Sequence, residues 1–179
     1  MKDTEWCKSI EAKINDLESR MNKLDGSTVC SNKKIVRIEI AWPEDYIGGL
    51  HFTARVTPAV FELKKDGNYY SDSILFNSAR DTDEGTGRDL LSEYLDTDAV
   101  KQAVINALKE DGMEVDTISV FLPKENQGIK KYNGVKWWYW LKEREAGSSA
   151  VFTPVHDSGY SAGYVASAVG GCAPAFCVA

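Results

Sequence analysis

The most hydrophobic stretch of this 179-residue chain runs from Val135 to Leu141 and reads VKWWYWL. In an extended strand, Trp138 and Trp140 face one side, and the four odd-numbered residues of the stretch face the other. Because both faces are then apolar, the stretch predicts a central strand that is covered on both sides. The fold is therefore expected to be organised around this strand.

Shorter alternating patterns upstream and downstream indicate further strands. The expected strands cover 34–40, stopped by Trp42-Pro43; 51–63, interrupted by Pro58; 69–76; and 117–122, stopped by Pro123. Lys65-Asp66-Gly67-Asn68 is a hairpin turn signal between two of them. These strands predict small antiparallel sheets.

Two helices are expected between the strands. A short one covers 88–95, and Asp96 or Thr97 can cap a second, whose apolar face ends before Gly112. That face consists of Val100, Ala103, Val104, Ala107 and Leu108. The fold class is therefore α+β, with helices placed on a small antiparallel sheet.

The N-terminal segment 1–26 is expected to be a helix that ends at Gly26. Its apolar residues follow the spacing of heptad a and d positions: Cys7, Ile10, Ile14, Leu17, Met21 and Leu24. Because so short a helix is only marginally stable in water by itself, this row of apolar residues needs a partner to pack against. We favour self-association into a parallel coiled coil, and isoleucines at both the a and d positions favour a trimer over a dimer. The alternative is that the helix packs on its own domain. Residues 27–33 are expected to be a linker, and 34–179 the main domain.

Overall composition limits the classes of function. The chain is 43% hydrophobic and 27% charged, with a formal net charge of −6, which fits one globular core plus a short appendage. The acidic balance argues against nucleic acid or an anionic membrane as the main partner. No apolar run has the length of a membrane span, and the acidic N-terminal residues do not resemble a signal peptide, so synthesis is expected in the cytosol.

Residues that could support catalysis or metal binding are few. The two histidines, His51 and His156, lie in no nucleophile motif, and a structural role is expected for each. Segment 81–87 lacks the ligand pattern of a calcium loop and the lysine of a phosphate loop. Four cysteines, Cys7, Cys30, Cys172 and Cys177, are too scattered for a disulfide framework; in one strand the last two would face opposite sides. We expect no enzyme activity, no cofactor and no metal site.

The last 33 residues, 147–179, differ sharply from the rest in composition. They contain no Lys, Glu, Gln, Met or Trp, whereas those five types supply 38 of the 146 residues upstream. These are the amino acids that no codon ending in a pyrimidine encodes. A tail of this kind results when adenines in Asn codons are randomised. The alternative is structural, since Gly, Ala and Ser make up 17 of the 33 residues and suit tight loops.

Two motifs flank this tail. Trp138-Tyr139-Trp140-Leu141-Lys142 precedes it, and Gly170-Gly171-Cys172-Ala173-Pro174-Ala175-Phe176-Cys177 closes it. The combination resembles the C-terminal half of a C-type-lectin-like domain, and more narrowly the variable proteins of diversity-generating retroelements of phages and gut bacteria. Phe121-Leu122-Pro123-Lys124-Glu125-Asn126 resembles the turn that precedes that half. Lys142 stands where that family usually has Arg, and Cys172 where it has Val or Arg.

This resemblance implies a fixed scaffold and a variable face. The scaffold would include Trp138, Trp140, Pro174 and Phe176, with a variable region at 147–171. Tyrosines there would give large contact area at low entropic cost, and small residues would set the shape. The expected ligand-binding residues are Phe152, Pro154, His156, Ser158, Tyr160, Ala162, Gly163, Tyr164, Val165 and Ala168.

The resemblance also implies a function class. The chain would be a display protein that binds a protein or surface ligand of a host or neighbouring cell, such as a phage receptor-binding protein on a virion or cell surface. Clustering by the N-terminal helix, through Ile10, Ile14, Leu17, Met21 and Leu24, would add avidity. One alternative is a fixed phage or prophage assembly protein of the same fold. Another is an enzyme like the formylglycine-generating enzymes, which share the fold and use cysteines.

Overall fold

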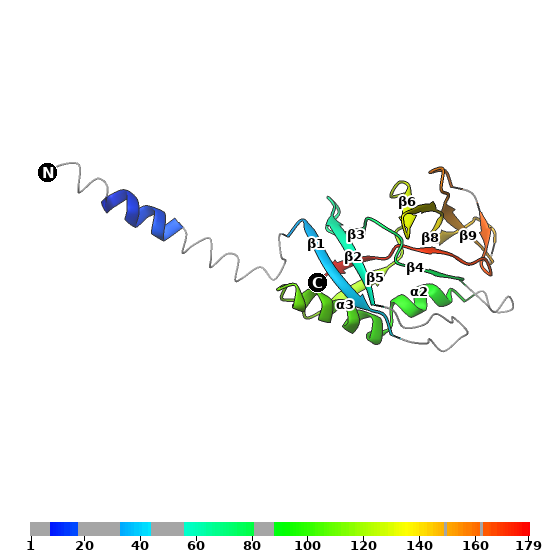
Figure 1. The fold of residues 1–179 in the computed structure, drawn as a ribbon, viewed down its shortest axis with the longest axis horizontal. Helices are drawn as coiled ribbons and strands as arrows, with labels where there is room; N and C mark the ends of the chain where they lie inside the picture. The colour runs from blue at the N-terminus through cyan, green and yellow to red at the C-terminus, as the bar shows by residue number, and fades with distance from the viewer. Residues whose placement is uncertain (1–7, 18–32, 44–55, 81–87, 149, 162) are drawn as a thin grey trace. The chain divides into compact units, whose positions relative to one another are not determined.

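A computed structural model describes residues 8–17, 33–43, 56–80, 88–148, 150–161 and 163–179 (Figure 1). The chain divides into two units, Met1–Asn32 and Lys33–Ala179. In the first unit, residues 8–17 are helical, and Ile14 and Leu17 are exposed on that helix. Cys7, Met21, Leu24 and Gly26 lie outside the described residues.

The Lys33–Ala179 unit is a mixed α/β domain of small, mostly antiparallel sheets with few helices. Its first sheet has the strand order β1-β2-β3-β12-β5, and every pair in it is antiparallel. These strands are β1 Ile35–Ala41, β2 Val56–Leu63, β3 Tyr69–Ser71, β12 Ala175–Val178 and β5 Ile118–Phe121. The C-terminal strand thus lies inside a sheet formed mainly by the first half of the domain (Figure 1).

A second sheet has the order β10-β9-β8-β11-β4, with β8 at its centre. Its strands are β10 Tyr164–Val165, β9 Val151–Val155, β8 Tyr139–Arg144, β11 Gly170–Cys172 and β4 Phe76–Ser78. The β8–β11 pair is parallel, and the other pairs are antiparallel. A separate two-stranded ribbon joins β6 Lys130–Tyr132 to β7 Val135–Trp137.

The two helices begin at side-chain caps. Asp89 caps α2 Leu90–Leu95 by accepting a hydrogen bond from the backbone N–H of Ser92, and Thr97 caps α3 Asp98–Glu110. α3 packs against β1 and β5. The expected apolar face of α3 is confirmed, because Val100, Val104, Ala107 and Leu108 are buried and Ala103 packs against the core. The expected strand alternation in β1 is confirmed too.

Three expected strands differ from those in the structure. β2 runs through Pro58 without interruption: among the described residues, β3 pairs with β2 only at Phe61–Leu63, so Pro58 has a strand on one side only, where a missing N–H is tolerated. The expected strand 69–76 is split into β3 and β4, which belong to different sheets.

The stretch VKWWYWL is also divided. Tyr139, Trp140 and Leu141 form the start of β8, and all three are buried, so the expected central, doubly covered strand is confirmed there. Val135 and Trp137 belong instead to the ribbon and are exposed, so the same expectation is wrong for β7. The chain leaves the ribbon at Trp138 before entering the sheet.

Cys172 and Cys177 are free thiols on two different strands, β11 and β12, in two different sheets. Their expected placement on opposite faces of one strand is therefore wrong, because Ala173-Pro174 separates the two strands. Cys7 and Cys30 lie outside the described residues, as does His51.

Candidate ligand-binding face

The candidate face is built on an aromatic layer at the centre of the second sheet. Trp140 is fully buried, and its indole N–H donates to the Ser78 carbonyl oxygen at 3.0 Å. Trp138 meets the Trp140 ring edge-on, with ring centroids 4.9 Å apart. Pro174 and Phe176 are buried as well, and Phe176 stacks on Tyr69. All four expected scaffold residues therefore lie in or against the core.

Arg80, which sequence analysis did not single out, connects this layer to the helices. Its fully buried guanidinium donates to the Asp89 carboxylate, with Nε 2.9 Å from Oδ1, and to the carbonyl oxygens of Leu141 and Lys142. The same group lies 4.0 Å from the centroid of the Phe152 ring. One side chain therefore holds together the α2 cap, the middle of β8 and the start of β9.

The charge of Asp89 depends on this contact. Burial alone would raise the pKa of Asp89, but the hydrogen bonds and positive charge of Arg80, aided by Ser92, lower it below its ordinary value. The carboxylate therefore stays charged and paired across the neutral pH range.

Trp138 supports the tail directly through two contacts. Its ring stacks on Tyr164, with centroids 4.6 Å apart. Its other neighbour is Gly170: a Cβ added there would lie 2.2 Å from Trp138 Cη2, closer than atoms can approach. The Gly170-Gly171 pair is therefore a steric requirement, since a Cβ on Gly171 would also meet the Trp138 carbonyl oxygen at 2.6 Å.

The aromatic stacking continues outward through the turn after β9. His156 stacks on Tyr160 at 4.5 Å between centroids and lies tilted against Tyr164 at 5.1 Å. Two backbone hydrogen bonds close the turn. The His156 N–H donates to the Tyr160 carbonyl oxygen, and the Gly159 N–H donates to the His156 carbonyl oxygen. His156 Nε2 is buried and has no hydrogen-bond partner among the described residues.

The expected ligand-binding residues divide by exposure. Those exposed are Ser158, Tyr160, Gly163, Tyr164 and Val165, while His156 and Ala168 are half-buried. Tyr160 is 59% exposed, so its ring covers no core. Ala162 lies outside the described residues. We call the five exposed residues the tail face.

Two expected display residues are not displayed. Phe152 is 0% exposed, and its ring is enclosed by Trp140 and the guanidinium of Arg80. Pro154 is buried opposite Trp140 in the β8–β9 pair. Both point into the domain because their strand has its alternate side chains on the core. Gly163 is exposed, yet a Cβ there would lie 2.7 Å from Val151 Cγ1, so it fits the expected shape-setting role.

Sequence analysis missed exposed apolar residues next to the tail face. Val169 is exposed within the tail, and Ile129, Val135 and Trp137 are exposed on or beside the β6–β7 ribbon. The Asn133-Gly134 pair was a usable signal: both residues have positive φ, 50° and 80°, as a two-residue hairpin turn requires. This turn predicts the β6–β7 hairpin.

A groove of about 1240 Å³ lies elsewhere on the domain, lined by the β2–β3 turn, α2, β5 and the segment after β5. Charges of both signs line it, including Lys65, Lys124, Asp66 and Glu93. Tyr70 donates to Asp66 there, and this hydrogen bond lowers the pKa of the Asp66 carboxyl. The lining favours no single charge type of ligand.

Two features bear on possible chemistry in the described ranges. Across these ranges, no three His, Cys, Asp or Glu side chains gather as a metal site would require. Burial raises the pKa of the Cys172 thiol strongly, which disfavours the reactive thiolate. No helix in the described residues combines the length and apolar character needed to cross a membrane.

In comparisons with known proteins, the chain matches no protein-family model, no curated protein sequence and no solved structure.

Proposed function

We propose that this chain is a non-enzymatic ligand-binding display protein whose tail face contacts the ligand. The proposal rests on the separation of exposed side chains from buried ones within the tail. Ser158, Tyr160, Tyr164 and Val165 are exposed, whereas Phe152 of the same tail is buried against Arg80 and Trp140 from outside it. Tyr164 also stacks on Trp138, which lies outside the tail. Exposed positions on such a support accept substitution at little cost in stability.

A C-type-lectin-like fold is part of this proposal. The aromatic strand β8 pairs with β11, and β12 returns to the first sheet between β3 and β5. Together β8 and β12 enclose the excursion that presents the tail face, which is the arrangement the resemblance implies. Cys172 and Lys142 remain the departures from that family's motifs.

Diversification by adenine mutagenesis is the second part. The absence of five amino-acid types from 147–179 supports it, and the exposed tyrosines are suited to contact. The test is the nucleotide sequence of the locus. We expect a second near-copy of the tail-coding bases that differs only where it carries adenine, with mismatches in the codons of Ser158, Tyr160 and Val165. Absence of a copy, with mixed third bases in the tail, would favour a fixed assembly protein instead.

Clustering of several heads is the third part. Ile14 and Leu17 are exposed on the helix at 8–17, as the buried seam of a coiled coil would be in a single chain. A homotrimer would present three tail faces, so weak single contacts would give avid binding where the ligand is repeated on the surface of a host cell or a neighbouring cell. Sedimentation of the full chain and of an I14E/L17E variant tests this. We expect the variant to be monomeric, and an unchanged oligomer would contradict the coiled coil.

A further inference from the structure

The β6–β7 ribbon presents a pair of like charges that nothing in the described residues balances. Lys131 and Lys136 lie directly opposite each other in the antiparallel register, and both are exposed. Neither makes an ion pair with a described residue. Like charges at directly opposed positions destabilise a strand pair. The ribbon therefore holds two ammonium groups together at an energetic cost.

The surrounding sequence adds to this positive charge. From Asn126 to Lys142, every charged residue is a lysine, in a chain whose net charge is −6. Lys130 differs from its neighbours, because it is buried and donates to the Ser71 carbonyl oxygen at 2.5 Å. It fixes β6 to the rest of the domain, so the exposed lysine pair is held on an anchored element.

Exposed apolar side chains alternate with the lysines. On β7, Val135 is 64% exposed and Trp137 is 41% exposed, on either side of Lys136. Large aromatic side chains at a surface are typical of protein contacts, where they supply most of the binding energy. Because neighbouring residues of a strand point to opposite faces, Val135 and Trp137 lie on the other face of the ribbon from the lysine pair. The lysine face therefore fits an acidic surface through its charge, and the apolar face is separate from it.

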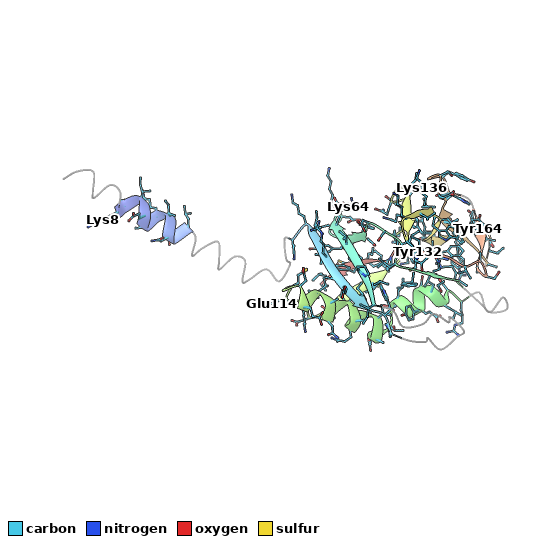
Figure 2. The ribbon with its side chains drawn as sticks, in the orientation of Figure 1. Lys8, Lys64, Glu114, Tyr132, Lys136 and Tyr164 are labelled. Carbon is cyan, nitrogen blue, oxygen red and sulfur yellow. The ribbon has the colours of Figure 1, made fainter. Side chains whose placement is uncertain are left out.

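The ribbon adjoins the tail face. Asn126 Nδ2 donates to the Gly159 carbonyl oxygen at 2.8 Å, and a Cβ added to Gly159 would lie 3.3 Å from Ile129 Cγ1. The turn that carries Tyr160 therefore packs beside the segment leading into β6. In Figure 2, Lys136 and Tyr164 lie at the same end of the domain as β8 and β9.

We infer that the β6–β7 ribbon is a fixed docking element for an acidic polypeptide segment of the ligand, beside the tail face. It deepens the proposed function, on which it rests for the identity of the neighbouring face. A long nucleic acid is disfavoured because the net charge of −6 would repel it, whereas an acidic segment can contact the ribbon alone.

Short poly-L-glutamate at low ionic strength is the probe, with binding measured by titration calorimetry on the full chain. We expect binding that weakens as salt rises, and an affinity at least about tenfold lower in K136E. That variant is informative because it places a carboxylate opposite Lys131, which stabilises the strand pair. Its melting temperature should therefore be unchanged or higher, so a loss of binding cannot result from misfolding.

The matched control is K34E, which reverses one exposed lysine outside the ribbon and so changes the net charge by the same amount as K136E. It should weaken poly-L-glutamate binding far less than K136E does. W137A changes the opposite face of the ribbon and should leave the affinity for poly-L-glutamate nearly unchanged. The inference is overturned if poly-L-glutamate does not bind, if K136E binds it as well as the wild type, or if oligothymidylate binds more tightly. The proposed function is tested separately. If the locus has no second copy of the tail-coding bases, the proposed function fails, but the result of the poly-L-glutamate experiment is unaffected.

Discussion

The tail contains two kinds of residue that look alike in sequence and behave differently in the fold. Phe152 and Tyr160 are both aromatic and lie eight positions apart, yet the first is fully buried and the second is 59% exposed. The difference comes from partners outside the tail, since Arg80 and Trp140 enclose Phe152, whereas among the described residues the Tyr160 ring stacks on His156 of the tail itself. Burial in the tail therefore depends on residues distant in sequence. Substitutions in the buried aromatic layer and substitutions on the tail face should change the free energy of unfolding by different amounts.

Removal of Arg80 is the largest expected disruption of the buried layer. R80M would remove the positive charge that pairs with the partly buried Asp89 carboxylate, which would keep hydrogen bonds from Ser92, and the donor to two carbonyl oxygens. Removing one partner of a buried ion pair destabilises a protein by about 3–5 kcal/mol. Urea unfolding followed by tryptophan fluorescence measures the loss.

The matched control is R88M, which removes an exposed arginine paired with Glu93 at 2.6 Å. Exposed pairs contribute about 0–1 kcal/mol, so R88M should unfold near the wild-type midpoint. Equal losses in the two variants would show that the buried position of Arg80 is unimportant.

The second expected effect is at Gly170, where Trp138 leaves no room for a side chain. G170A should lower the free energy of unfolding by about 2–3 kcal/mol, as overpacking in a rigid environment does. The clash involves an aromatic ring that is itself held by Trp140 and Tyr164.

The double variant G170A/W138L tests this cause. Replacing the ring makes space, so the alanine should be less harmful in the W138L background than in the wild type, giving a measurable coupling energy. Additive losses would mean that Gly170 is required for another reason.

The third expected effect is a pH dependence caused by Lys130, which holds the ribbon to the domain. Burial lowers the pKa of Lys130 to about 8, below the ordinary lysine value. Between about pH 8 and pH 10 the unfolded chain binds more protons at this residue than the folded one, so its contribution to stability rises with pH. Relative to K130M, the wild type should gain about 2 kcal/mol between pH 7 and pH 9.5.

Comparing the wild type with K130M cancels the contributions of the other ionisable groups, because both proteins contain them. The measurement is the urea midpoint of each protein across that pH range. A constant difference between them would mean that Lys130 stays charged in the folded domain.

Sequence patterns predicted the elements whose signals are local. Strict alternation predicts β1, and an apolar face that ends before Gly112 predicts α3, with Asp96 or Thr97 as its cap, of which the structure uses Thr97. The turn at Lys65–Asn68 followed from residue type alone. In each case the residues that decide the structure lie within one element, so no distant contact is needed to identify it.

Patterns failed where distant contacts decide. Apolar residues in VKWWYWL continue through Trp138 on both faces of the expected strand, so hydrophobicity does not separate the exposed β7 from the buried β8. The burial of Arg80 could not be predicted, because its partners Asp89, Leu141 and Phe152 lie on three different elements. The display residues were chosen from residue type, which cannot distinguish Phe152 from Tyr160.

The smallest expected effects are at the tail face itself. Y160S and V165S should each change the free energy of unfolding by no more than about 0.5 kcal/mol, since both side chains are exposed. Y164S should be slightly less stable than Y160S and V165S. The Tyr164 ring stacks on Trp138, and such an aromatic pair contributes about 0.5–1.5 kcal/mol to stability. F152S, from the same tail, should instead destabilise the domain by more than about 3 kcal/mol. If Y160S were as harmful as F152S, the tail would be a structural element throughout and could not accommodate a varied face. A small loss at Tyr160 and Val165 together with a large one at Phe152 would instead place the limit of tolerated variation at the edge of the buried aromatic layer.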